Sequence, residues 1–133
     1  MHPVESIVSA IARQEGWFDR SSLPFRRNNP GDLRLAGQRG AHAPAGEPEV
    51  LGQAPPIAQF NSAALGVTAL YRQVWLQVAD GQTLAQLIAQ WAPPRENKTS
   101  VYLANVAGWT GLPTDVPILN ILPALTYPTG GHA

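Results

Sequence analysis

Hydrophobic residues recur at helical spacing near the start of the chain. They lie at positions i, i+3, i+4 and i+7, the pattern of a helix with one buried face: Val4, Ile7, Val8 and Ile11. The next step of four reaches Glu15, where a hydrophobic residue would be expected, and Gly16 then favours the end of the helix. The pattern therefore predicts a helix from about Val4 to Glu15, with a carboxyl group at the end of its buried face.

Apolar stripes also predict several later helices. They cover about residues 63–79, 84–91, 99–109 and 118–122, and Ser62, Thr83 and Thr99 are suitable capping residues. Two short apolar runs, Leu33–Leu35 and Ile57–Phe60, are expected to form strands. The order of helix, small β element and further helices indicates an α+β fold that is mainly α.

The length of 133 residues suits one domain spanning residues 1–133. Residues 17–31 are rich in turn-forming residues, and residues 36–56 are crowded with Gly, Pro and Ala, which predicts a flexible loop. Residues 127–133 are expected to be a frayed tail. Nothing in the pattern suggests an obligate oligomer, so we expect a monomer.

Composition narrows the classes of protein to consider. Hydrophobic residues make up 44% of the chain and charged residues 14%, which is typical of an ordered globular domain. The formal net charge is zero, so a nucleic-acid-binding role is not expected. An interaction domain would have to use Arg side chains that are interspersed with acidic residues: Arg13, Arg20, Arg26, Arg27 and Arg34.

Metal, disulfide and membrane signals are weak. The chain has no cysteine, and His2, His42 and His132 lack the spacing of metal ligands, so we expect neither a metal site nor a cofactor. No apolar stretch approaches the ~18 residues that a membrane span needs. The start of the chain also lacks the layout of a secretory signal. Action at the periplasm or cell wall would therefore require a leader absent here, or delivery by a phage or a secretion system.

Three motifs, in order, resemble the lysozyme-like superfamily, in particular lytic transglycosylases and phage muramidases. Glu15 ends the first helix, as the catalytic Glu does in that family. The run from Glu96 to Tyr102 resembles a Glu-Thr-Arg-x-Tyr-Val pattern with the spacing from Thr99 to Tyr102 preserved. Residues 27–34, Arg-Asn-Asn-Pro-Gly-Asp-Leu-Arg, resemble an Asn-Asn-Pro-Gly-Asn-Leu-Arg signature of cell-wall hydrolases. The Ser after the catalytic Glu and the Gly-Leu-Met-Gln and Ala-Tyr-Asn-Ala-Gly segments of transglycosylases are absent.

The resemblance implies an enzyme that cleaves the β-1,4 bond between N-acetylmuramic acid and N-acetylglucosamine in peptidoglycan. Glu15 would be the general acid, and the Tyr102 hydroxyl would hold or orient its proton. Burial disfavours an ionised carboxyl group, so Glu15 is expected to stay protonated to a higher pH than a surface Glu unless a cation lies close by. A Glu that returns to solvent or pairs with Arg13 or Arg20 is the structural alternative.

The reaction has two possible routes. In a lytic transglycosylase, which we favour, the C6 hydroxyl of the muramic sugar attacks its own anomeric carbon and Glu15 serves as acid and then base. A hydrolytic muramidase would need a second carboxylate. The candidates are Asp19, Asp32 and Glu96, each of which has an alternative structural role as a loop, turn or salt-bridge residue.

Other residues are candidates for substrate binding. Asn29 and Asn97 carry amides that would reach sugar groups or satisfy nearby backbone, and Gly31 belongs to the same turn as Asn29. Trp17 and Phe60 are candidates for lining a sugar groove, whereas Trp91 and Trp109 fit apolar helical stripes and are expected in the core. A non-catalytic wall-binding or virion structural module remains a different class that the same fold would allow.

Overall fold

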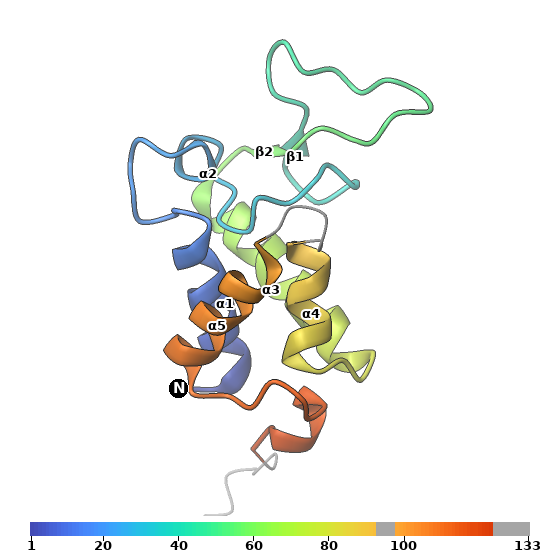
Figure 1. Cartoon of the computed structure of the whole chain (residues 1–133). Coiled ribbons are helices and arrows are strands. Elements are labelled where there is room, and N and C mark those ends of the chain that lie inside the picture. The colour runs from blue at the N-terminus through green and yellow to red at the C-terminus, as the bar shows by residue number, and fades with distance from the viewer. Residues whose placement is uncertain (93–97, 124–133) are drawn as a thin grey trace, which may run out of the picture.

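The computed structural model describes residues 1–92 and 98–123, which are mainly helical (Figure 1). The elements are the helices α1 (Pro3–Gln14), α2 (Leu23–Arg26), α3 (Ala63–Ala79), α4 (Leu84–Trp91) and α5 (Thr99–Thr110), the strands β1 (Ala41–His42) and β2 (Gln59–Phe60), and the 3-10 helix η2 (Ile118–Ile121). This arrangement confirms the α+β, mainly α class.

Helix α1 forms as its hydrophobic spacing predicts. The His2 side chain caps its start by accepting a hydrogen bond from the Val4 N–H at 3.1 Å. The four apolar residues of the predicted face are buried, and Glu15 at its end is half-buried. Glu15 is the C-terminal cap, and Gly16 follows with a φ of +85°, a conformation that other residues rarely adopt. The carboxyl group is therefore fixed where the helix stops.

One apolar core holds α1, α3, α4 and α5 together. Helix α1 packs against α5 and α3, and α4 packs against α5 (Figure 1). The largest fully buried side chains of this core come from every one of these helices and from η2: Ile7, Ile11, Leu70, Leu84, Leu87, Ile88, Val106 and Ile118. Each helix therefore contributes apolar side chains to this core, although α3 and α5 also expose Trp75, Leu76, Val101 and Trp109.

The β element differs from the prediction. Strand β1 pairs antiparallel with β2, with Ala41 opposite Phe60 and His42 opposite Gln59. The predicted strand Leu33–Leu35 is wrong, because only Arg34 forms an isolated bridge, to Ile57. Two causes are visible: the preceding Asp32 has a φ of +51°, and the facing segment contains Pro55 and Pro56, which lack the N–H that a longer ladder needs.

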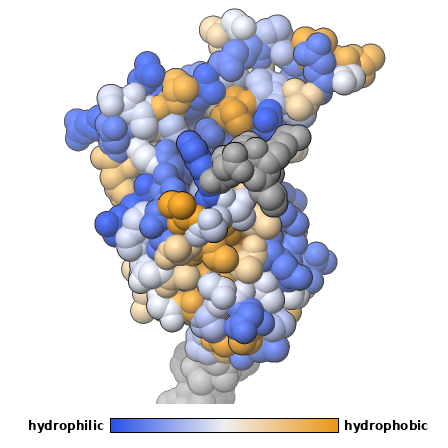
Figure 2. Space-filling model, viewed as in Figure 1, coloured by the Kyte–Doolittle hydropathy of each residue, from blue (hydrophilic) through white to orange (hydrophobic). Residues whose placement is uncertain are grey.

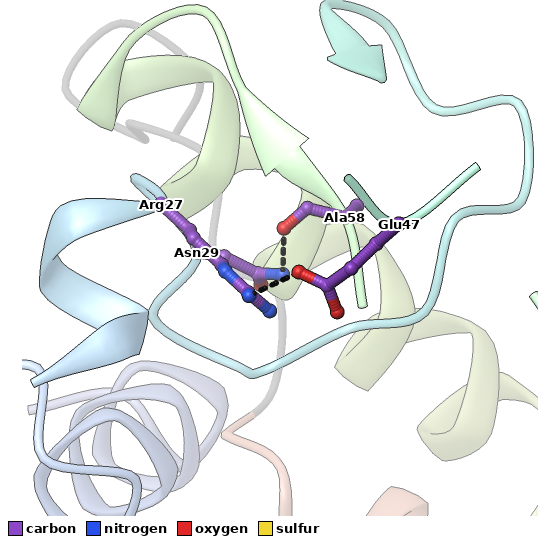
Figure 3. Close-up of polar contacts among 4 residues, drawn as sticks. All are labelled: Arg27, Asn29, Glu47 and Ala58. Carbon is purple, nitrogen blue, oxygen red and sulfur yellow. Dashed lines mark hydrogen bonds and ion pairs between the residues drawn. The ribbon is translucent and has the colours of Figure 1, made fainter. Parts of the chain in front are cut away.

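Residues 43–56 form a long excursion from the rest of the molecule, seen at the top of Figure 1. It contains the exposed hydrophobic residues Val50 and Leu51. Figure 2 shows an orange patch at the upper right, over this excursion. The excursion is tied back by an ion pair in which Arg27 Nη2 lies 2.6 Å from Glu47 Oε2 (Figure 3). The segment predicted to be one loop, residues 36–56, therefore contains β1, and it is also held by hydrogen bonds from Arg34 and Leu35 to the carbonyl oxygens of Pro55 and Pro56.

Two smaller features refine the predicted elements. Helix α2 lies in the segment expected to contain only turns, although Ser22, whose hydroxyl accepts from the Phe25 N–H, and Pro24 are ordinary helix-start residues. The last predicted helical segment is the 3-10 helix η2. The predicted frayed tail, residues 127–133, lies outside the described residues. Within the described part of the chain, no helix is both long and apolar enough to cross a membrane.

Candidate functional site

A groove of about 680 Å³ lies where the helices meet the turns and loops before α3. Its walls come from the end of α1, from residues 31–34, from α3, from the end of α4 and from α5. A volume of this size is typical of a site for a small ligand or for a short segment of a polymer. Glu15, Asp32 and Tyr102 all line it.

Glu15 and Tyr102 are in direct contact at the groove. The Tyr102 hydroxyl donates a hydrogen bond to Glu15 Oε2 at 2.7 Å, although the two residues are far apart in the sequence. Glu15 is half-buried, whereas Tyr102 is only 6% exposed. Burial, followed by the negative charge of Glu15 and this hydrogen bond, raises the pKa of Tyr102 well above its usual value. The phenol therefore stays protonated and remains a hydrogen-bond donor to Glu15.

The contact is reinforced by the packing of α1 against α5. One turn after Tyr102, Asn105 Nδ2 donates a hydrogen bond to Gln14 Oε1 at 2.9 Å. At the start of α5, the Thr99 hydroxyl donates a hydrogen bond to the carbonyl oxygen of Ala92, at the end of α4. These bonds fix the register of α5, so the spacing from Thr99 to Tyr102 places the phenol against the end of α1.

Asp32 is the second carboxylate that the described structure places in this groove. It is half-buried, and burial raises its pKa above the usual value although the positive charges of Arg27 and Arg34 oppose the shift. Its negative charge also contributes to the raised pKa of Tyr102, so it lies within electrostatic reach of the phenol. Its positive φ is uncommon for a residue other than glycine.

The turn before Asp32 is held by the buried side chain of Asn29. Its Nδ2 donates to the carbonyl oxygens of Leu33 at 2.9 Å and of Ala58 at 2.8 Å, and its Oδ1 accepts from the Leu33 N–H at 2.9 Å (Figure 3 shows the bond to Ala58). The residue is 0% exposed. Of the two roles considered, sugar binding and satisfaction of the turn's backbone, the contacts match the second.

Gly31 also shapes the groove through its backbone. Its carbonyl oxygen accepts a hydrogen bond from Trp91 Nε1 at 2.9 Å, which fixes the indole of Trp91 at the groove. A side chain at Gly31 would meet Leu70, since an added Cβ would lie 2.8 Å from Leu70 Cδ1. Trp91 was expected only in the core, and it both packs against the core and lines the groove.

Several predicted site residues lie away from the groove. Phe60 is 1% exposed and belongs to a separate small cluster with Leu35 and Ala58. Trp17 lines a different crevice, and its ring centroid lies 5.9 Å from that of Phe25. Asp19 is exposed and its pKa is lowered by hydrogen bonds from Ser21. The groove lining predicted for the two aromatic residues is therefore not seen.

Five glutamines line the groove, and none of them was among the predicted site residues. They come from α1, the loop before β1, α3 and α4: Gln14, Gln38, Gln73, Gln77 and Gln90. The available signal was Gln77, which interrupts the apolar stripe of α3 one residue before Val78 and is buried. A buried amide in such a stripe usually has a specific partner, because leaving it unpaired is costly.

Two predicted residues, Glu96 and Asn97, lie outside the described residues. Within the described part, no group of three or more His, Asp or Glu side chains is placed to hold a metal ion. Comparison of the chain with protein-family models, with curated proteins and with solved structures found no match. The functional argument therefore depends on the geometry of the groove.

Proposed function

We propose that the protein is a lysozyme-like enzyme that cleaves the β-1,4 bond between N-acetylmuramic acid and N-acetylglucosamine in peptidoglycan. The observation that carries the proposal is the contact of Glu15 with Tyr102 at the groove. A carboxyl group on the C-cap residue of a core helix that lines a groove and receives a hydrogen bond from a buried phenol is suited to proton transfer. The groove is polar and open enough to take a segment of a glycan strand.

Glu15 would protonate the glycosidic oxygen as the bond to the anomeric carbon breaks. The carboxylate formed in this step accepts the hydrogen bond from Tyr102, which stabilises the charge. Because the raised pKa of Tyr102 keeps the phenol protonated, this donor is available throughout the reaction. General acid catalysis of this kind contributes ~10²- to 10⁴-fold to the rate.

In the route that we favour, the same Glu15 carboxylate then acts as a base. It accepts the proton of the C6 hydroxyl while the C6 oxygen bonds to the anomeric carbon, which gives a 1,6-anhydro product without added water. One carboxyl group is sufficient for this lytic transglycosylase reaction. The protein would have to reach the cell-wall side of a membrane, by export or by delivery.

The position of Asp32 supports hydrolysis as the second candidate. Asp32 shares the groove with Glu15, and Arg27 and Arg34 favour its ionised form. A carboxylate at about 5 to 5.5 Å from the acid would act as a nucleophile, and one at about 6.5 to 9.5 Å would activate water. Three residues were candidates for a second carboxylate. Asp19 is exposed and accepts hydrogen bonds from Ser21, and Glu96 lies outside the described residues. Asp32 is therefore the residue to test.

Product masses separate these candidates. Purified peptidoglycan is digested with the wild-type protein and with Asp32→Asn, and the released muropeptides are analysed by mass spectrometry. We expect 1,6-anhydro products, one water lighter than reducing-end products, from both proteins. Reducing-end products that disappear with Asp32→Asn would establish hydrolysis instead. No released muropeptide from the folded wild-type protein would refute the proposed enzyme and favour a non-catalytic wall-binding or virion module.

A further inference from the structure

Two of the groove glutamines form a directed pair. Gln77 on α3 is 4% exposed, and its Nε2 donates a hydrogen bond to Gln90 Oε1, on α4, at 2.6 Å. Gln90 is exposed at the groove. The side-chain oxygen of Gln90 accepts the hydrogen bond from Gln77. The Gln90 Nε2 group is a donor and is therefore available to a molecule in the groove.

The other end of the Gln77 amide has no partner among the described residues. Its Oε1 is buried and accepts no hydrogen bond, whereas its Nε2 also lies 3.4 Å from Gln82 Oε1. An unpaired buried polar atom lowers stability, because its hydrogen bond to water is lost on folding and not replaced. Gln77, which lines the groove, therefore orients a donor on Gln90 and carries a buried acceptor that lacks a donor.

We propose that Gln77 and Gln90 form a subsite for the acetamido group of an N-acetylated sugar. Gln90 Nε2 donates to the acetamido carbonyl oxygen, and Gln77 is the positioning residue that sets the orientation of the Gln90 amide. In this proposal the acetamido N–H supplies the donor that Gln77 Oε1 lacks. A secondary amide is the matching group because it carries both an acceptor and a donor. This inference rests on the proposed function, since it assigns one part of the glycan strand to one part of the same groove.

The nearby aromatic ring is consistent with a sugar at this position. Trp91 follows Gln90 directly at the end of α4, lines the groove and is held by its hydrogen bond to Gly31. Sugar rings present apolar faces that pack on such side chains, while their polar substituents reach the surrounding donors and acceptors. Gln90 and Trp91 therefore offer one polar and one apolar contact side by side.

The test compares two neutral probes that differ at one substituent. Chitotetraose carries acetamido groups at C2, and cellotetraose has the same β-1,4 backbone with hydroxyl groups there. Binding is measured by isothermal titration calorimetry to the full chain carrying Glu15→Gln, which prevents cleavage. We expect chitotetraose to bind at least tenfold more tightly than cellotetraose, which corresponds to one net hydrogen bond of about 1.4 kcal/mol.

Further substitutions in the Glu15→Gln chain test whether Gln77 and Gln90 cause the preference for chitotetraose. Gln90→Ala should weaken chitotetraose binding about tenfold and leave cellotetraose binding unchanged. Gln77→Leu should also lose selectivity, although its melting temperature should equal or exceed that of its parent because a buried unpaired atom is removed. Gln53→Ala, at an exposed position outside the groove, is the matched control and should change neither affinity.

Three results would overturn the subsite: equal binding of the two probes, no binding of chitotetraose, or a Gln90→Ala effect of equal size on both probes. If Gln77 had only a structural role, Gln77→Leu would lower the melting temperature and weaken the binding of both probes equally. Failure of the proposed peptidoglycan-cleaving function would give a different result, because the wild-type protein would then release no muropeptides. Selective chitotetraose binding that persisted in that case would still support the subsite.

Discussion

The helical region and the turn region of this protein are stabilised in different ways. Helices α1, α3, α4 and α5 share a large apolar core. Residues 27–60, by contrast, contain one small hydrophobic cluster, of Leu35, Ala58 and Phe60, and rely on hydrogen bonds from side chains to backbone. The groove lies between these regions, with Glu15 and Tyr102 on the first and Asp32 on the second.

The two walls of the groove are therefore held in place by different kinds of contact. The proposed acid and its phenol partner are held by helices whose positions are set by close packing, which tolerates little displacement. The opposite wall depends on a few polar contacts, of which the Asn29 network is the most buried. Substitutions that break one kind of contact should therefore affect stability and groove geometry differently.

The largest effect on stability is expected where the two regions touch. A Cβ added to Gly66 of α3 would lie 1.7 Å from the backbone oxygen of Asn28, an overlap that no side-chain rotation relieves. Gly66→Ala should therefore lower the free energy of unfolding by about 3 kcal/mol or more, as measured by urea denaturation.

Gly108→Ala is the matched control, because Gly108 also lies within a helix and an added Cβ there meets nothing within 4 Å. This substitution should stabilise the protein by about 0.5–1 kcal/mol, since alanine favours helix more than glycine does. Equal effects at the two glycines would show that α3 does not approach Asn28 as closely as described.

The next effect concerns the turn region alone. Asn29→Ala removes the three hydrogen bonds that connect the turn to Leu33 and Ala58, and should cost about 2–3 kcal/mol in urea denaturation. Glu47→Ala, which removes the more exposed ion pair with Arg27, should cost no more than about 1 kcal/mol. A larger loss at Glu47 than at Asn29 would reverse our ranking of the contacts that hold this region.

The smallest effect depends on pH. Burial raises the pKa of Asp32 in the folded state above its usual 3.8, so the folded state binds this proton more tightly than the unfolded state. The stability contributed by Asp32 is therefore full below pH 3.8 and is lost as the pH rises through the folded pKa.

Asp32→Asn cannot titrate and keeps a side chain that tolerates a positive φ. The unfolding free energy of Asp32→Asn minus that of the wild type should increase from pH 3 toward neutral pH and then level off. Urea denaturation at several pH values measures this difference. A difference that declines over the same range would show that Arg27 and Arg34 outweigh burial at Asp32.

The sequence predicts the helical region better than the turn region for a physical reason. Helices with one apolar face repeat their signal every three or four residues, and caps such as Ser62 and Thr83 mark their starts. The strands contain two residues each and are placed by the Asn29 network and by prolines, which leave no periodic signal. The predicted strand at Leu33–Leu35 is wrong for this reason.

The candidate site was predicted in part for a similar reason. Glu15 breaks an apolar stripe, and the spacing from Thr99 matched a known pattern, so its proximity to Tyr102 was expected and the hydrogen bond is present. The side chains of Trp17 and Phe60 were misplaced because aromatic residues fit both cores and grooves. The Gln77–Gln90 pair depends on how α3 meets α4, which single-helix patterns do not specify.

The most direct test of the central claim is the rate of muropeptide release from purified peptidoglycan by the wild-type protein and by Glu15→Gln. The account predicts measurable release by the wild type and a loss of ~10²-fold or more with Glu15→Gln, whose fold is checked by its unchanged circular dichroism spectrum. Equal release by the two proteins, or release by neither, would contradict the role of Glu15 as the proton donor.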